Sequence, residues 1–353
     1  MLKSLYSGIA GLKVNQQKLD VIGNNVANVG TTAFKGSSVN FQDMLSQSVS
    51  EAQASSLNQG GVNGSQIGLG VKVGSIAINQ SQGSMTPTGS NTDLAIDGDG
   101  YFIVEKGPIV FNPSDPAGTL TVDNDTATAT HAISNSLGAQ IMYTRDGAFV
   151  RDNQGNLVTT DGLRVMGYSV GGFDGVVPTP APVATSIDTA TANSAHFVDA
   201  KNVVTANDKN LVSIIIPDTV MSGTLPLKVT GISISKNGLV VATLSDKSQT
   251  ALGQVAMATF NNTNGLKDIG GNLNQSTVNS GQPVLKSGLG NTVAGADNSG
   301  GYGAINANFL EASNVDLAQE FTDMIVTTRA FEANGKTISN GDEILQTIIG
   351  LKR

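Results

Sequence analysis

Apolar residues recur every seven positions at both ends of the chain. Sustained spacing near 3.5 residues is typical of helices that pack side by side. The pattern therefore predicts one helix at each end, each with an apolar stripe along one face. The N-terminal stripe comprises Leu2, Leu5, Ile9, Leu12, Leu19 and Val26. The C-terminal stripe comprises Leu317, Phe321, Met324, Phe331, Ile338, Leu345 and Ile349.

The charges at the two ends have opposite signs. Residues 1–35 carry four lysines and one aspartate, a net charge of +3, whereas residues 310–353 carry seven acidic and four basic residues, a net charge of −3. Ser313 and Asp316 have the spacing of a capping box, and a helix that runs from Asp316 to Ile349 is about 50 Å long. We expect the two terminal helices to attract each other and to pair.

The residues between the ends follow the pattern of strands and turns. Apolar pairs flank the turn sequences at 97–100 and 237–238, and because Asp-Gly and Asn-Gly favour tight turns, each predicts a hairpin. Segment 45–67 is rich in Ser, Gln, Asn and Gly and is expected to be an extended linker. Glycines and prolines at 171–182 mark off segment 172–230 as a separate small β domain.

Together these patterns predict an α+β protein with nested layers. We expect a helical core of residues 1–30 and 310–353, an extended arm of residues 31–70 and 303–309, a β-rich body of residues 71–171 and 231–302, and an inserted outer β domain of residues 172–230. A helix pair attached to a β body has little of its own chain to cover its stripes. We therefore expect other copies of the chain to bury them, and the ends of the free monomer to stay disordered until assembly.

Composition narrows the classes of function. Hydrophobic residues make up 39% of the 353 residues, charged residues only 14%, and there are 42 glycines, which fits a β-rich protein with many turns. The net charge of −8, with no run of Lys or Arg, argues against nucleic-acid binding. Cysteine is absent, so disulfides and thiolate metal sites are excluded. No apolar stretch is long enough to insert in a membrane, and the N-terminus lacks the pattern of a cleaved Sec signal.

No group of residues predicts a catalytic, metal or cofactor site. The chain has two histidines, His131 and His196, too few for a zinc site or a histidine-based triad. The Asp-Gly-Asp-Gly sequence at 97–100 lacks the further ligands of a calcium loop. Glu105 and Asp146 have no evident carboxylate partner, so a glycosidase pair is not supported. We therefore predict neither an enzyme nor a cofactor.

Four motifs, in order along the chain, resemble those of the bacterial flagellar rod and hook axial proteins. They lie at residues 19–35, 88–102, 143–149 and 310–331, and so cover both ends and most of the β body. The residues that carry the resemblance are Asn24, Asn25, Asn28, Phe34, Lys35, Asp93, Gly98, Gly100, Arg145, Gly147, Ser313, Asn314 and Asp316.

The resemblance implies a structural subunit that polymerises through its terminal helices. The chain length and the segment 172–230 favour a hook protein, which forms a curved, flexible tube and acts as a universal joint between motor and filament; a distal rod protein is the alternative. We further hypothesise that segment 45–67 and the outer domain set the curvature and stiffness of the tube.

The resemblance also implies partners and a location. The partners are further copies of the chain in a helical tube, the distal rod protein, the hook cap protein, the hook–filament junction proteins and the flagellar type III export apparatus, with no nucleic acid and no membrane insertion. The location is extracellular, in the basal body and hook, after export without a cleaved Sec signal.

Two functions of other classes remain open on the sequence alone. A secreted β-domain adhesin would explain the β body but leaves the heptads at the two ends without a role. An extracellular hydrolase on a β scaffold lacks a catalytic group of residues. Truncation of both terminal helices separates these possibilities, because an adhesin or enzyme would keep its activity whereas a polymer subunit would lose assembly.

Overall fold

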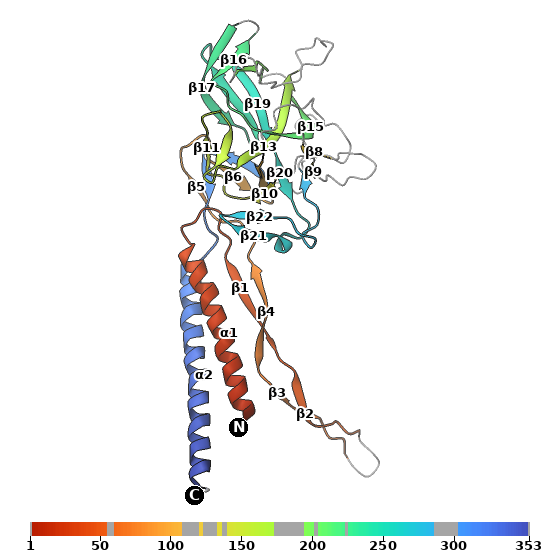
Figure 1. Ribbon diagram of the computed structural model, residues 1–353, viewed down its shortest axis with the longest axis vertical. Coiled ribbons are helices and arrows are strands. Elements are labelled where there is room, and N and C mark those ends of the chain that lie inside the picture. The colour runs from red at the N-terminus through yellow and green to blue at the C-terminus, as the bar shows by residue number, and fades with distance from the viewer. Residues whose placement is uncertain are drawn as a thin grey trace. The chain divides into compact units, whose positions relative to one another are not determined.

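The computed structural model describes residues 2–54, 60–107, 120–122, 133–135, 140–172, 194–200, 204–222, 225–285 and 303–351. The chain divides into two compact units, which we call the helical unit (Met1–Ser81 and Ser313–Arg353) and the β unit (Gln82–Ala312). The chain begins and ends with a helix, and all of the strands lie between these two helices in the sequence (Figure 1). The predicted α+β class is therefore confirmed.

The helical unit is composed of two antiparallel helices and a two-stranded ribbon (Figure 1). The helices are α1 (Leu2–Ala27) and α2 (Leu317–Leu351). At 1.5 Å per residue, the 35 residues of α2 span about 52 Å and the 26 residues of α1 about 39 Å. The C-terminal turns of α2 therefore extend beyond the start of α1.

The N-terminus of α2 differs from the capping box predicted at Ser313. The helix begins at Leu317, and the Asp316 carboxylate accepts hydrogen bonds from the backbone N–H groups of Ala318 and Gln319. The Ser313 hydroxyl accepts only from the N–H of Val315, before the helix starts. Asp316 is thus the N-cap itself, because its side chain satisfies the orphan donors of the first turn.

The ribbon lies in the predicted arm of residues 31–70 and extends into residues 71–78, which were predicted to belong to the β body; residues 303–309, predicted to belong to the arm, lie in the β unit instead. Strand β1 (Ser37–Asp43) pairs antiparallel with β4 (Val71–Ile78), with a bulge between Asn40 and Phe41, and β2 (Ser46–Ser50) continues the pairing with β3 (Ser65–Gly68). Both faces of β2 and β3 are exposed. Backbone hydrogen bonds hold such strands without an apolar face, so a composition rich in Ser and Gln does not distinguish them from a linker.

Among the described residues, the β unit contains one connected network of 17 strands and two smaller sheets. The network comprises β7 (Tyr101–Lys106), β8 (Leu120–Val122), β9 (Ile133–Asn135), β10 (Gln140–Thr144), β11 (Phe149–Arg151), β12 (Leu157–Thr159), β13 (Arg164–Gly172), β14 (Ser194–His196), β15 (Val204–Ser213), β16 (Thr219–Ser222), β17 (Leu225–Ile234), β18 (Leu239–Leu244), β19 (Gln249–Val255), β20 (Met257–Thr259), β21 (Lys267–Gly270), β22 (Leu273–Gln275) and β23 (Val284–Leu285), with the 3-10 turn η1 (Thr263–Gly265). The smaller sheets pair β5 (Met85–Pro87) with β25 (Phe309–Glu311), and β6 (Leu94–Asp97) with β24 (Ala304–Ala307).

Strand β7 lies at the centre of the network and divides its core. It pairs with β10, β13 and β20. Phe102 and Val104 point into one hydrophobic cluster, and Tyr101 and Ile103 into a second, because successive side chains of a strand face opposite sides. The apolar residues of β7 are therefore buried on both faces of the strand.

One predicted hairpin is confirmed and the other is wrong. Strands β17 and β18 pair around Asn237 and Gly238, as predicted. Strands β6 and β7, on either side of residues 97–100, pair with different partners. Gly98 and Gly100 do adopt the positive φ angles of a turn, 110° and 143°. However, the backbone of Gly303 lies close to Gly98, and strand β6 pairs with β24 instead of β7.

The described part of segment 172–230 is not separate from the β body. Its strand β15 pairs with β13, and β17 pairs with β18, so these strands belong to the same network. Residues 173–193, 201–203 and 223–224, with the proline cluster that suggested a boundary, lie outside the described residues, as do residues 286–302 of the predicted body.

Candidate functional site: the helix pair and its junction with the ribbon

Small residues bring α1 and α2 into close contact. A Cβ atom added to Gly341 would lie 2.6 Å from Leu5 Cδ2, and one added to Gly8 would lie 3.3 Å from Ile338 Cγ1. Further along the pair, Lys18 Nζ lies 3.5 Å from Asp323 Oδ1. The residue numbers rise on one helix as they fall on the other, so these contacts fix an antiparallel register. These glycines were not predicted from the sequence, because the heptad pattern is defined by large apolar residues alone.

The predicted stripes are partly covered within the single chain. Their half-buried members are Leu5, Leu12, Leu19, Val26, Met324, Ile338 and Leu345. Their exposed members are Ile9, Leu317, Phe321, Phe331 and Ile349, and the side chain of Leu2 lies outside the described residues. The members that are half-buried are thus partly covered within one chain, because α1 and α2 cover each other, whereas disorder of the ends in the free monomer stays a prediction.

The face of α2 that remains free carries a second apolar stripe, which the sequence analysis did not identify. Its spacing of three, four or seven residues keeps it on one side of the helix. Val326 is 58% exposed and Leu351 82% exposed. This outer stripe comprises Val326, Ala333, Thr337, Ile344, Ile348 and Leu351, all of them exposed and none charged. Thr337, Ile344 and Leu351 are seven residues apart, so a search for a second heptad could have found it.

Thr337 does not interrupt the apolar character of the outer stripe. Its hydroxyl donates to the backbone carbonyl of Ala333, 3.0 Å away. The donor is therefore satisfied inside the helix, and the threonine can be buried at an interface without leaving that hydrogen unpaired.

The buried motif residue Asn25 joins three elements of the helical unit. Its carboxamide exchanges two hydrogen bonds with the backbone of Ser37 on β1, donating to the carbonyl at 2.8 Å and accepting from the N–H at 2.9 Å. The same Nδ2 donates to Glu320 Oε1 on α2 at 2.9 Å. With 2% of its surface exposed, Asn25 has these protein partners in place of water.

A second asparagine, Asn314, holds the chain just before α2. Its Oδ1 accepts from the Gly36 N–H at 2.9 Å, and its Nδ2 donates to the carbonyls of Asn79 and Ser81 at 2.7 and 2.9 Å. Lys35 Nζ donates to the same Ser81 carbonyl at 2.8 Å. Asn314 and Lys35 therefore fasten the two chain segments that lead out of the helical unit.

The remaining N-terminal motif residues shape the turn between α1 and β1. The Asn28 carboxamide donates to the backbone carbonyl of Asn24, which ends the helix, and the Phe34 carbonyl accepts from the Asn314 N–H. Ala33 adopts a φ of 55°, a left-handed conformation rare for a residue with a Cβ atom. The structure thus brings Asn24, Asn25, Asn28, Phe34, Lys35, Ser313, Asn314 and Asp316 to one end of the helical unit.

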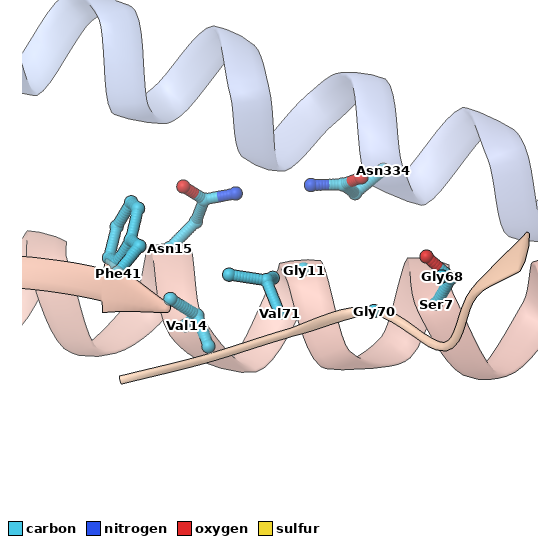
Figure 2. A pocket seen from close by; sticks show the side chains of 9 residues that line it. All are labelled: Ser7, Gly11, Val14, Asn15, Phe41, Gly68, Gly70, Val71 and Asn334. Carbon is cyan, nitrogen blue, oxygen red and sulfur yellow. The ribbon is translucent and has the colours of Figure 1, made fainter. Parts of the chain in front are cut away.

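A groove of about 460 Å³ lies between α1, α2 and the ribbon (Figure 2). Its lining is mixed, with Val14 and Phe41 beside the carboxamides of Asn15 and Asn334. An added Cβ at Gly70 would lie 3.3 Å from the Ala10 Cβ, so the ribbon backbone follows α1 closely. The groove holds no cluster of charged residues and no pair of titratable groups.

Two motif residues of the β unit, Arg145 and Gly98, take part in a network around a buried ion pair. Arg145 Nε donates to Glu311 Oε2 at 3.0 Å, and Arg145 Nη2 donates to the Gly98 carbonyl at 2.8 Å. An added Cβ at Gly147 would lie only 1.6 Å from the Leu94 carbonyl oxygen, so this position requires glycine. The Asp93 carbonyl accepts from the Asn308 N–H. Glu311 stands inside the last motif, but it was not among the residues predicted to be important from the sequence.

The described residues offer no catalytic arrangement. They include no group of three metal-ligating side chains and no helix long and apolar enough to cross a membrane. Asp146 Oδ1 accepts from the Ala148 N–H, as in a turn. Burial raises the pKa of the Glu105 carboxyl, which has no hydrogen-bond partner among the described residues. His131 and the side chain of His196 lie outside the described residues.

Three family models match separate stretches of the chain. The model described as "Flagella basal body rod protein" matches residues 5–35, the "Flagellar hook protein FlgE/F/G D1 domain" matches residues 132–242, and the "Flagellar basal body rod FlgEFG protein C-terminal" matches residues 306–351. The first match covers most of α1, the second falls in the β unit, and the third covers α2.

Full-length relatives carry the same descriptions. The flagellar basal-body rod protein FlgG of Bacillus subtilis (strain 168) is 36% identical over 353 residues, with all of both chains covered. The flagellar hook protein FlgE of Borreliella burgdorferi is 28% identical over an alignment of 460 residues that also covers all of both chains. Among solved structures, the flagellar hook protein FlgE2 of Helicobacter pylori has a TM-score of 0.37 at 13% identity, covering 64% of this chain and 100% of that one. Since the 36% identity extends along the whole chain, and family models match both terminal helices and the β unit, the chain belongs to the flagellar rod and hook axial protein family.

Proposed function

We propose that the chain is a non-enzymatic structural subunit that polymerises through the outer stripe of α2 into an axial tube of the flagellum. The observation that carries the proposal is the outer stripe itself, an uncharged apolar face that continues onto the part of α2 beyond α1. Burial of one large apolar side chain contributes about 1.5–3 kcal/mol. Burial of Val326, Ile344, Ile348 and Leu351 would therefore favour the contact between neighbouring copies.

A contact of this kind is expected to give an open polymer. Among the described side chains of α1 the exposed large apolar ones are Tyr6 and Ile9, which are too few to form a stripe like that of α2, so we expect the outer stripe to contact a different surface of the next copy. A contact between two different surfaces of identical subunits repeats without closing, unless the rotation closes a ring. The proposed product is a helical tube with α1 and α2 in its inner layer.

Within the family, we propose a rod-type subunit. The rod relative matches the chain over equal length at 36% identity, whereas the hook relative needs an alignment of 460 residues at 28% identity. Segment 172–230, which favoured the hook on the sequence alone, is also covered by the rod relative. A hook subunit is the second candidate, supported by the hook relative, whose alignment also covers all of both chains.

The proposed partners and location follow from this function. The partners are further copies of the chain, the neighbouring axial proteins of the rod and hook, and the flagellar type III export apparatus; the hook cap and hook–filament junction proteins are partners only of the second candidate, a hook subunit. The proposed location is the axial part of the flagellar basal body.

An assembly assay with Ile344→Asp and Ile348→Asp tests the proposal. A charge in the outer stripe would have to be buried at the interface, so we expect the purified variants to remain monomeric at concentrations at which the unmodified chain forms tubes. Gln346→Asp adds the same charge to the same turn, outside the stripe, and is expected to assemble. Assembly of both stripe variants would contradict the proposal.

The form of the tube separates the two candidates within the family. Electron micrographs of the reassembled chain should show straight, rigid tubes if the subunit is of the rod type. Curved tubes of variable bend would instead favour the hook.

A further inference from the structure

The chain enters and leaves the β unit through two short strands that pair with each other. Strand β5 carries the chain in and β25 carries it out, and three residue pairs join them, from Phe309 with Pro87 to Glu311 with Met85. They form a two-stranded sheet outside the main network. A pair of this size is marginally stable by itself, so other contacts must keep it closed.

The Glu311 carboxylate joins both segments to the rest of the β unit. Its Oε2 accepts from Arg145 Nε at 3.0 Å, and its Oε1 accepts from the Gly83 N–H at 2.9 Å. Gly83 belongs to the incoming segment, whereas Arg145 lies between β10 and β11 of the main network. Arg145 is 7% exposed and Glu311 2% exposed, so water competes little for these bonds.

A third segment, the turn after β6, is held by the same group of residues. Arg145 Nη2 donates to the carbonyls of Gly98 and Ile96, at 2.8 and 3.4 Å. Gln82, the first residue of the β unit, accepts from the Gly98 N–H through its Oε1 at 3.1 Å. The entry segment, the exit segment and this turn are therefore joined through one buried guanidinium.

We propose that the Arg145–Glu311 pair is a lock on the entry and exit strands of the β unit. With the pair intact, β5 and β25 separate only when the β unit unfolds as a whole. Without it, the two strands separate locally while the main network stays folded. The proposal concerns the β unit alone and does not depend on how the chain polymerises.

The lock arises from the chemistry of a buried pair. Removal of either member leaves an uncompensated charge in a water-poor site, and the opened state, which returns that charge to water, becomes more populated. The guanidinium fork also sets the geometry, because its separate nitrogen atoms serve the carboxylate and the turn carbonyls.

Amide hydrogen exchange on the full-length chain tests the lock. The reporters are the N–H of Gly83, which donates to Glu311, and the N–H of Ala312, which donates to the Ser84 carbonyl. In Arg145→Gln and in Glu311→Gln we expect both amides to exchange at least about tenfold faster than in the unmodified chain. The amide of Ala251, bonded to the Val198 carbonyl in the main network, is expected to keep its rate.

Arg151→Gln is the matched control. It removes the Arg151–Asp218 ion pair of the same unit, which is largely exposed, and should leave the Gly83 and Ala312 rates unchanged. The lock would be overturned if the amides of Gly83, Ala312 and Ala251 all exchanged equally faster in the Arg145 and Glu311 variants. It would also be overturned if the Gly83 and Ala312 amides kept their rates. If these variants do not fold, Arg145→Lys keeps the charge and loses the fork, and the same selective acceleration is then required of it.

Discussion

Asn25 Nδ2 donates a hydrogen bond of 2.9 Å to Glu320 Oε1, and so joins α1 to α2 across 295 residues of sequence. The same carboxamide fixes the first residue of β1 through two backbone hydrogen bonds. One buried side chain thereby sets the position of the helix pair and the start of the ribbon together.

Asn25→Ala tests this position. The substitution leaves the Ser37 N–H and carbonyl without their partner, so we expect the free energy of unfolding of the helical unit to fall by about 1–3 kcal/mol. Urea denaturation followed by circular dichroism measures it. Asn40→Ala, which removes an exposed bond of 3.4 Å to Ser75 Oγ, serves as control. Equal losses in the two variants would contradict the assignment.

Gly341→Val tests the close approach of the two helices. An added Cβ at Gly341 meets Leu5 Cδ2 at 2.6 Å, whereas one at Gly335 meets nothing within 4 Å. Both substitutions place a β-branched residue in α2, so the helix propensity changes equally. We expect Gly341→Val to be less stable than Gly335→Val by about 1–3 kcal/mol, because the helices must move apart. Thermal melts of the two variants give the difference, and similar melting temperatures would argue against the close approach.

Gly147→Ala tests the tightest backbone contact of the β unit. The new methyl group would lie 1.6 Å from the Leu94 carbonyl oxygen, and that oxygen belongs to the backbone and cannot rotate away. We expect a loss of more than about 3 kcal/mol in the free energy of unfolding of the β unit. Gly231→Ala, where a Cβ meets nothing within 4 Å, should be tolerated. A stable Gly147→Ala variant with an unchanged denaturation midpoint would show that the contact is relaxed in solution.

The buried Glu105 carboxyl predicts a dependence of stability on pH. Burial raises its pKa above the ordinary 4.5, and the Arg164 guanidinium, which lies on the paired strand, opposes the shift by a smaller amount. The folded chain therefore keeps the proton at pH values where the unfolded chain has lost it. The contribution of Glu105 to stability is greatest below pH 4.5 and is lost as the pH rises through the raised pKa.

Glu105→Gln removes this titration and keeps the shape of the side chain. We expect its melting temperature to exceed that of the unmodified chain at neutral pH, and the difference to shrink at about pH 4. Asp97→Gln, at an exposed carboxylate, is the control. A destabilised Glu105→Gln variant at neutral pH would mean that the ionised carboxylate has a favourable partner.

The outer part of the ribbon is expected to affect the mechanics of the polymer. Deletion of residues 46–68 removes β2 and β3 but keeps the pairing of β1 with β4. Because the removed strands are exposed on both faces, we expect the helical unit to fold and the tubes to assemble, with altered curvature or bending stiffness in electron micrographs. The variant Val49→Ser with Ile67→Ser keeps the length and removes the exposed apolar groups. Tubes of unchanged curvature and stiffness after the deletion would exclude a mechanical role.

The sequence by itself determined the helices at the two ends, their tendency to pair, and the β-rich middle. Heptad spacing and opposite net charges are local properties that can be counted along the chain. The hairpin at Asn237 and Gly238 was also predictable, since both of its strands and its turn lie within a few residues.

Only the tertiary structure decided which faces of the helices are covered. Leu5 and Ile338 are half-buried because glycines of the partner helix let the two backbones approach each other. The apolar face of α2 that stays exposed is instead the one that carries Val326, Ile344 and Leu351. The pairing of β6 with β24, in place of a local hairpin, and the Arg145–Glu311 bond both join residues far apart in sequence. Such contacts depend on how distant segments fit together in space, which periodicity along the chain does not encode.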